Sequence, residues 1–221
     1  TRLIKPSNFD PTKKYPVFVY VYGGPHAQLI TNSYLDGANL WMYWMAEQGY
    51  LVFTVDNRGS DNRGFAFESV IHGKLGVNEI DDQMKGVDYL KSLPYVDTNR
   101  LAIHGWSFGG FMTTSIMLRK PDVFKVGVAG GPVTDWKYYE VMYGERYMDT
   151  PAENQKGFDE SSTLNDVKNL KGKLLLIHGT SDDTVVMQHN LVLIKKFIEA
   201  EKQVDFFAYP MHEHNVTGKD R

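Results

Sequence analysis

The stretch HGWSFGG, residues 104–110, places a serine between glycines, directly after one apolar run and directly before another. Gly105-x-Ser107-x-Gly109 is the pattern of a nucleophile elbow, in which a strand turns sharply into a helix and exposes a serine at the turn. Residues two before and two after that serine must be small, because the strand and the helix approach closely there. The alternative is that Ser107 only caps a helix, but a cap leaves the flanking glycines unexplained. The stretch therefore predicts a nucleophilic serine.

Apolar runs of strand length recur along the chain and alternate with helical patterns. The runs rich in β-branched and aromatic residues are 15–22, 50–56, 100–106, 124–131, 172–179 and 203–210, and helical patterns occupy 78–93, 107–120 and 186–201. Most of the runs are continuous, which is typical of parallel strands covered on both faces. We expect a mostly parallel α/β sheet with helices on both faces and with the chemistry at the carboxyl ends of the strands. Residues 132–170 are less regular, and we expect them to form short helices over one face.

Size, charge and composition are those of one ordinary domain. The 221 residues predict a single domain over 1–221, and the formal net charge of -3 gives no reason to expect nucleic acid or an anionic membrane as a partner. No apolar run is long enough to span a membrane. The absence of cysteine excludes disulfides, thiolate metal sites and a cysteine nucleophile. The first residues carry neither an initiator methionine nor a signal peptide, so we expect a processed form or a fragment.

A serine nucleophile requires a base, and the base requires an acid. In α/β-hydrolases the chain order is serine, acid, histidine, which removes four histidines as bases: His26, His72, His104 and His178. Asp182 and Asp183 follow a strand run, and either carboxylate fits the acid. His212 and His214 follow the last strand run, and either imidazole fits the base, whereas His189 lies in a helical pattern. No HExxH pattern or third ligand accompanies His212 and His214, so we expect no metal and no organic cofactor.

The oxyanion that develops in acyl transfer requires hydrogen-bond donors. The amide of Phe108 supplies one donor because it directly follows Ser107. After the first strand run the chain continues Tyr22-Gly-Gly-Pro, and the Tyr22 phenol is our candidate for the second donor. The alternative is that Tyr22 packs as an ordinary side chain of the sheet.

Four motifs in order carry a resemblance to a known family: YGGP at 22–25, GWSFGG at 105–110, HGTSDD at 178–183 and HEHNV at 212–216. Together they resemble the catalytic domain of the prolyl oligopeptidase family, over essentially the whole chain. The dipeptidyl peptidase IV branch is the most similar part of that family, and within it the prolyl tripeptidyl aminopeptidases. The resemblance implies the α/β-hydrolase fold.

The resemblance also implies roles for individual residues. It implies Ser107 as the nucleophile, Asp182 as the acid and His214 as the base. It further implies that the Tyr22 hydroxyl and the Phe108 amide together form the oxyanion hole.

A substrate site follows from the same resemblance. The family lines its proline pocket with aromatic and aliphatic side chains, and the matching positions are Phe108, Val133, Trp136, Tyr139, Tyr143 and Val185. A rigid pyrrolidine ring loses little conformational entropy on such a surface. Glu140 matches a carboxylate that binds the free amino group of the substrate in the tripeptidyl members. Without the resemblance, Trp136 and Tyr139 are core aromatics and Glu140 is a solvated helix residue.

The sequence therefore predicts a serine exopeptidase domain that cleaves peptides after proline through an acyl-enzyme and releases N-terminal tripeptides or dipeptides. An esterase or acylaminoacyl hydrolase with the same triad is one alternative, and a non-catalytic binding module of the same fold is another. Members of the family carry a β-propeller before this domain and a closing helix after it, and neither is expected within these residues. The resemblance also implies a periplasmic or exported full-length protein and a homodimer.

Overall fold

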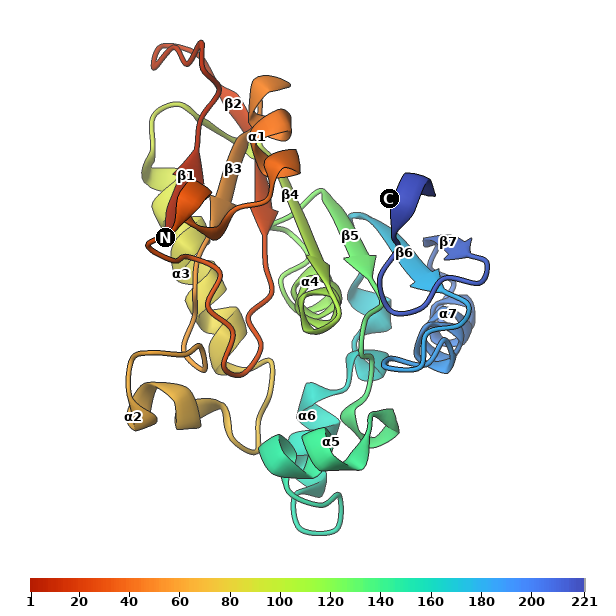
Figure 1. Cartoon of the computed structure of the whole chain (residues 1–221). Helices are drawn as coiled ribbons and strands as arrows, with labels where there is room; N and C mark the ends of the chain where they lie inside the picture. Colours follow the sequence, from red (N-terminus) through yellow and green to blue (C-terminus); the bar gives the residue numbers. More distant parts are fainter. Residues whose placement is uncertain (221) are drawn as a thin grey trace.

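A seven-stranded sheet runs through the molecule in this computed structural model, which describes residues 1–220 (Figure 1). The strand order across the sheet is β1-β3-β2-β4-β5-β6-β7. The bounds of the strands are β1 Arg2–Ile4, β2 Tyr15–Tyr20, β3 Leu51–Thr54, β4 Val96–Trp106, β5 Val126–Gly130, β6 Lys173–Gly179 and β7 Asp205–Tyr209. Neighbouring strands are parallel, except that β1 and β3 pair antiparallel. The predicted α/β-hydrolase fold with a mostly parallel sheet is confirmed.

Each of the predicted strand runs overlaps one of the parallel strands β2 to β7, although β4 begins at Val96, four residues before its run, and β1 lies outside the runs. Three residues are too few to show a hydrophobic period, so β1 has no sequence signal of its own. The buried side chain of Arg2 holds this edge strand in place. Its guanidinium donates to the carbonyl oxygen of Asp36 at 2.6 Å and to the hydroxyl oxygen of Thr54 at 3.2 Å.

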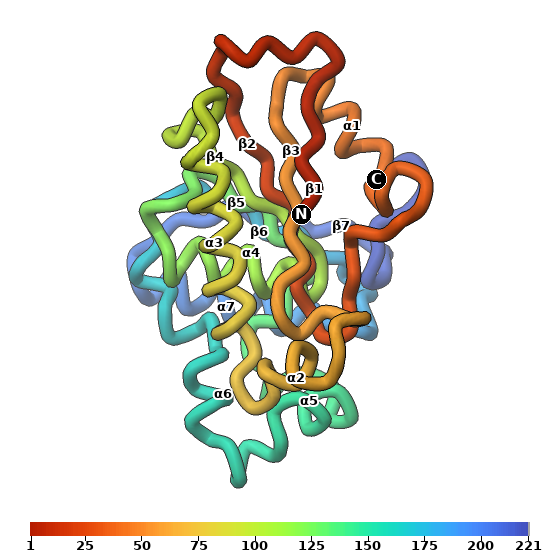
Figure 2. The backbone as a smooth tube through the Cα atoms, turned by 90° about the vertical axis from the view of Figure 1, so that its left-hand side faces the viewer, coloured from red at the N-terminus to blue at the C-terminus, as the bar shows by residue number. Residues whose placement is uncertain are grey.

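Helices lie on both sides of the sheet, with α1 on one side and α3, α4 and α7 on the other (Figure 2). Their bounds are α1 Leu40–Glu47, α2 Phe65–Glu68, α3 Asn78–Ser92, α4 Phe108–Arg119, α5 Val141–Met148, α6 Gln155–Ser161 and α7 Gln188–Glu199. The three helical patterns of the sequence correspond to α3, α4 and α7, and their ends agree to within two residues. Among residues 1–220, no helix combines the length and apolar character that a membrane span requires.

The residues of β2 alternate between two cores of unequal size. Val17 and Val19 belong to the larger core, which also contains buried side chains of α3 and α4, while Phe18 and Tyr20 pack with Trp41 around a smaller core on α1. Beyond α1, this second face of the sheet carries an open groove. Its lining residues are Tyr20, Trp41, His104, Trp106, Ile177, Tyr209, Asn215 and Val216.

Residues 132–170 connect β5 to β6 through short helices, as the sequence predicts. They are η3 Trp136–Tyr138, α5, α6, η4 Thr163–Asn165 and η5 Val167–Asn169, where η denotes a 3₁₀ helix. The predicted position over one face is wrong for α5 and α6, because both lie beyond the carboxyl ends of the strands (Figures 1 and 2). A buried polar contact holds this connection in place: the Ser162 hydroxyl donates to Asp135 Oδ2 at 2.8 Å.

Candidate active site

Ser107 occupies the sharp turn between β4 and α4. Its φ of 59° and ψ of -119° lie where a non-glycine residue is strained. Two backbone hydrogen bonds hold the turn, one from the Ser107 amide to the Gly130 carbonyl at 2.8 Å and one from the Phe111 amide to the Ser107 carbonyl at 2.9 Å. The Ser107 side chain makes no capping hydrogen bond. The turn is therefore an elbow rather than a helix start capped by a serine.

The glycines beside Ser107 are required by the close approach of neighbouring backbones. A Cβ atom on Gly105 would overlap the carbonyl oxygens of Val21 and Gly109, and a Cβ on Gly109 would overlap the same Val21 carbonyl. A Cβ on Gly110 would lie 2.5 Å from the Gly130 carbonyl oxygen. The small residues that the sequence pattern predicts thus allow β2, β4 and β5 to crowd around the elbow.

A carboxylate and an imidazole meet near this elbow. The distance between His214 Nδ1 and Asp182 Oδ2 is 2.7 Å. Asp182 is buried, and its Oδ1 accepts hydrogen bonds from the amides of Thr184 at 3.0 Å and Val185 at 2.8 Å. Asp183 is exposed, and its Oδ1 accepts instead from the Thr184 hydroxyl at 3.3 Å. Of the two aspartates that spacing left open, the structure brings Asp182 to His214.

The hydrogen bonds around Asp182 keep it ionised. Burial acts to raise the pKa of this carboxyl, but hydrogen bonds from His178, His214 and the Val185 amide outweigh burial and hold the pKa well below its usual range. An ionised carboxylate beside His214 Nδ1 fixes the ring orientation and stabilises the imidazolium form.

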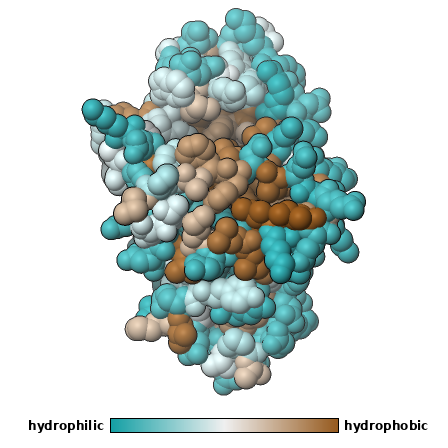
Figure 3. Space-filling view, turned by 90° about the vertical axis from the view of Figure 1, so that its right-hand side faces the viewer, coloured by the Kyte–Doolittle hydropathy of each residue, from teal (hydrophilic) through white to brown (hydrophobic). Residues whose placement is uncertain are grey.

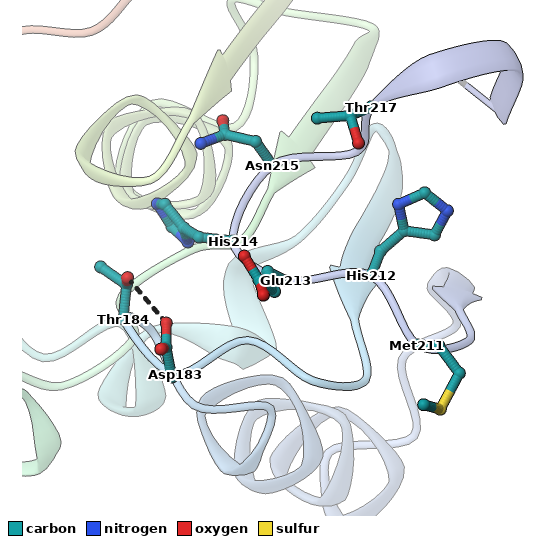
Figure 4. Close-up of a pocket in the computed structure, with 8 residues that line it drawn as sticks. All are labelled: Asp183, Thr184, Met211, His212, Glu213, His214, Asn215 and Thr217. Atoms are coloured by element: carbon teal, nitrogen blue, oxygen red, sulfur yellow. Dashed lines mark hydrogen bonds between the residues drawn. The ribbon is translucent and has the colours of Figure 1, made fainter.

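The two histidines after β7 point in different directions (Figure 4). His212 Nε2 lies 2.9 Å from Asp220 Oδ2, away from Asp182. The segment of His214 is tied to the elbow, because the Trp106 indole donates to the His214 carbonyl at 2.7 Å. His214 and Ser107 line one pocket of about 420 Å³, whose other lining residues are Tyr20, Tyr22, Trp106, Tyr139, Thr184 and Asn215.

Tyr22 lies in that pocket at the end of the segment that follows β2. Its side chain is partly buried, and burial raises the pKa of the phenol, so the hydroxyl remains a hydrogen-bond donor at neutral pH. The Tyr22 and Phe108 rings lie 6.1 Å apart, and Phe108 begins α4. The structure thus brings Tyr22 to the pocket of Ser107 and its ring close to the first residue of α4.

The four aromatic residues of the predicted proline pocket form one cluster. The Trp136 ring stacks on Tyr143 at 5.6 Å, and Tyr139 contacts both rings edge-on at 5.6 and 5.2 Å. Phe108 lies 5.3 Å from Trp136. Tyr139 reaches the pocket of Ser107. The nearly fully buried members of the predicted set are Phe108, Val133, Trp136 and Val185.

Glu140 is exposed and directly precedes α5. Its charge, acting after the larger effect of burial, helps to raise the pKa of Tyr139. The carboxylate therefore stands beside the one aromatic residue of the cluster that lines the pocket of Ser107.

Only one group of potential metal ligands occurs among residues 1–220: His26, Asp61 and Glu68, whose ligand atoms lie within 4.8 Å of one another. These residues do not line the pocket of Ser107. Two contacts of the site, the Trp106 indole and the His178 ring, have no signal in the sequence that assigns them to it. Trp106 belongs to the elbow motif itself, and His178 begins the motif that contains the acid.

Comparison with known families identifies the chain. The family model for S9 peptidases, described as the prolyl oligopeptidase family, matches residues 38–221. The chain belongs to the prolyl oligopeptidase family. Membership in the family places it among serine-type peptidases and confirms the resemblance found in the sequence.

Curated relatives in the family are much longer than this chain. The chain is 38% identical to dipeptidyl peptidase 8 of Mus musculus over 218 residues. This alignment covers 97% of this chain and 24% of the relative. It is 41% identical over 216 residues to the protein named "Probable dipeptidyl-aminopeptidase B" of Ajellomyces capsulatus (strain NAm1 / WU24). This alignment covers 96% of this chain and 23% of the relative. The chain therefore spans about a quarter of the length of these relatives.

Solved structures of the family superpose on nearly the whole chain. A protein from Bacteroides ovatus ATCC 8483, provisionally identified as a dipeptidyl aminopeptidase IV, matches with a TM-score of 0.98 and 59% identity. Porphyromonas gingivalis dipeptidyl peptidase 4 matches with a TM-score of 0.94 and 36% identity. Each match covers 99% of this chain and 31% of the other chain.

Proposed function

We propose that this chain is the catalytic domain of a serine exopeptidase that removes short N-terminal peptides by cleaving after proline. The observation that carries the proposal is the 2.7 Å contact between Asp182 and His214 in a segment that shares a pocket with the strained Ser107. The dipeptidyl peptidase names of the relatives support release of dipeptides. An esterase would use the same three residues, so the substrate assay below has to separate the two activities.

The reaction follows from the positions of these side chains. The Ser107 hydroxyl attacks the carbonyl carbon of the substrate proline while His214 takes the hydroxyl proton, and Asp182 stabilises the resulting imidazolium. The Tyr22 hydroxyl and the Phe108 amide donate to the oxyanion. His214 then gives the proton to the leaving amine, and the C–N bond breaks to leave an acyl-enzyme on Ser107. His214 then deprotonates a water molecule that attacks the acyl carbon, and it returns the proton to Ser107 Oγ as the ester C–O bond breaks, which releases the N-terminal fragment.

The nucleophile is tested by labelling with a fluorophosphonate and by hydrolysis of chromogenic substrates. We expect the wild-type protein to be labelled and Ser107→Ala to lose labelling and at least about 10³-fold in kcat. A Gly-Pro anilide should be hydrolysed with a higher kcat/KM than a p-nitrophenyl ester of a simple acid. Labelling that persists in Ser107→Ala would refute the nucleophile, and a preference for the ester would favour the esterase.

Release of tripeptides is a second candidate, supported by the exposed Glu140 next to Tyr139. A carboxylate at a fixed distance from Ser107 would bind the substrate ammonium and so select the length of the released peptide. If tripeptides are released, Glu140→Gln should lower kcat/KM for an Ala-Ala-Pro anilide by about 10- to 100-fold, the value of one charge-assisted contact. The exposed Glu145→Gln on α5 is the matched control. Equal losses in both variants, or faster cleavage of the Gly-Pro anilide by the wild-type protein, would contradict the tripeptide assignment.

A further inference from the structure

His178, the penultimate residue of β6, is fully buried and every polar atom of its ring has a partner. Its Nε2 lies 2.6 Å from the carbonyl oxygen of Val185 and 3.2 Å from Asp182 Oδ2. A carbonyl oxygen can only accept a hydrogen bond, so Nε2 carries the proton. The side-chain amide of Asn190 donates to Nδ1 at 2.9 Å. These contacts place a proton on Nε2, directed at the Val185 carbonyl with Asp182 Oδ2 beside it.

Asp182 accepts three hydrogen bonds, and the Nε2–H of His178, which donates to the Val185 carbonyl at 2.6 Å, also lies 3.2 Å from its Oδ2. Its Oδ1 accepts from two backbone amides, and its Oδ2 lies between His214 Nδ1 at 2.7 Å and His178 Nε2 at 3.2 Å. The amides fix one oxygen, but the position of Oδ2 relative to His214 depends on what lies on the other side of that oxygen. The ring of His178 occupies that side.

We propose that His178 is a positioning residue, whose Nε2–H holds Asp182 Oδ2 in line with His214 and thereby sets the working pH range of the triad. The inference rests on the proposed function, because it assigns a role in a reaction performed by Ser107, Asp182 and His214. It extends the triad inward to a second imidazole that neither contacts the substrate nor exchanges a proton with it.

A purely structural role does not account for this arrangement. A leucine or methionine would fill the same buried space without the desolvation cost of a polar ring. The ring instead provides an N–H donor beside a buried carboxylate, which favours the ionised form of that carboxylate. Loss of the donor should raise the pKa at which the coupled Asp182 and His214 pair takes up a proton. The acid limb of the pH profile would then move to higher pH.

Three titratable groups surround the His178 ring. Asp182 faces it from the loop after β6, His214 lies beyond Asp182 on the segment after β7, and His189 approaches from α7. His189 is also buried, but its Nδ1 accepts from the Thr134 amide at 3.2 Å rather than contacting Asp182. His189 is therefore a matched control, a buried histidine on a neighbouring element with a different partner.

The test compares two substitutions in the full chain. His178→Gln keeps an N–H at about the position of the imidazole Nε2, whereas His178→Met fills the space with no donor. The second-order rate of fluorophosphonate labelling is measured from pH 5 to 9 together with the thermal unfolding midpoint. We expect His178→Met to label about tenfold more slowly or worse, with its acid limb about half a pH unit or more higher. His178→Gln should restore the position of the limb and most of the rate.

The controls make the outcomes distinguishable. His189→Met should lower the unfolding midpoint without moving the acid limb. A folded His178→Met with an unchanged limb, or a His189→Met with the same shift, would overturn the positioning role. If His178→Met does not fold, the test rests on His178→Gln. The positioning role would be overturned if this variant lacked the wild-type labelling rate and the wild-type acid limb of the pH profile. Labelling that persists in Ser107→Ala would instead refute the proposed function itself.

Discussion

At the scale of the residue, Glu79 is a carboxyl group placed where water does not reach. It lies in the first turn of α3, fully buried, and its Oε2 accepts a hydrogen bond from the Gly76 amide at 3.0 Å. Its Oε1 has no hydrogen-bond partner among the described residues. Burial raises the pKa of this carboxyl from 4.5 to about 7, although the hydrogen bonds from nearby amides oppose the change.

Glu79 should make the protein less stable as the pH rises. Between pH 4.5 and about 7 the folded chain keeps a proton that the unfolded chain has lost, so the free energy of unfolding falls through this window. At about 1.4 kcal/mol per pH unit the loss is about 3 kcal/mol above pH 7. Glu79→Gln cannot ionise, so it should match the wild-type protein near pH 4.5 and exceed its stability at pH 8. Urea unfolding at both pH values measures this difference.

The control for Glu79 is the exposed Glu145→Gln. This variant should keep the wild-type change in stability between the two pH values. A Glu79→Gln protein that loses stability with pH as steeply as the wild type would show that another group causes the dependence.

At the active site, the sequence predicts which loops carry the catalytic groups but does not distinguish residues that are close together in the chain. The order of motifs identified the loops that hold the acid and the base. The residues alone do not distinguish Asp182 from Asp183, because the side chains of neighbouring residues in a loop point in different directions. The direction of the Asp182 side chain is set by hydrogen bonds from the Thr184 and Val185 amides. The resemblance to the family gave the choice that the geometry also favours.

At the scale of the element, long periodic or continuous apolar segments were predictable and short ones were not. The patterns of α3, α4 and α7 are long enough to define a buried face. The helix α1 has the sequence LWMYWMAE, which is apolar on nearly every side and shows no helical period. The strand β1 depends on Arg2, whose partners lie 34 and 52 positions away. Elements stabilised by such distant contacts have no local signal in the sequence.

For the connection between β5 and β6, the sequence predicts the short helices but not their position relative to the sheet. Its short helices follow from its irregular pattern, but their place beyond the strand ends depends on tertiary contacts. The Arg119 guanidinium at the end of α4 contacts Asp166 at 2.9 Å and the Glu160 carbonyl at 2.6 Å, and so anchors the far end of the connection. The same connection carries Trp136, Tyr139 and Tyr143, so the shape of the proposed substrate pocket depends on these anchors.

At the scale of the whole molecule, exposed apolar side chains gather on the side formed by β7 and α7 (Figure 3). Phe207 on β7 is 54% exposed, and Leu191 and Ile198 on α7 are also exposed. Contiguous apolar surface of this kind promotes association of proteins in water. The open groove on the α1 face of the sheet adds to the apolar surface near β7.

We expect the 221-residue chain to self-associate through this side at micromolar concentration. Phe207→Ser should reduce the average mass measured by sedimentation equilibrium and the binding of a hydrophobic dye, because it removes an exposed ring from the edge strand. Phe65→Ser is the matched control, since Phe65 is 84% exposed on α2. Equal effects of the two substitutions would show that association is not localised to the side of β7 and α7.

The hydrogen bond from the Trp106 indole to the His214 carbonyl makes the fluorescence of Trp106 sensitive to the position of the segment that carries His214. The indole ring precedes the nucleophile in the chain and is bonded to the segment that carries the base. Departure of that segment would free the indole N–H to water, and the fluorescence emission of Trp106 would shift to longer wavelength. The difference in emission between the wild-type protein and Trp106→Phe, which keeps the other three tryptophans, would report this contact in solution without any substrate or inhibitor.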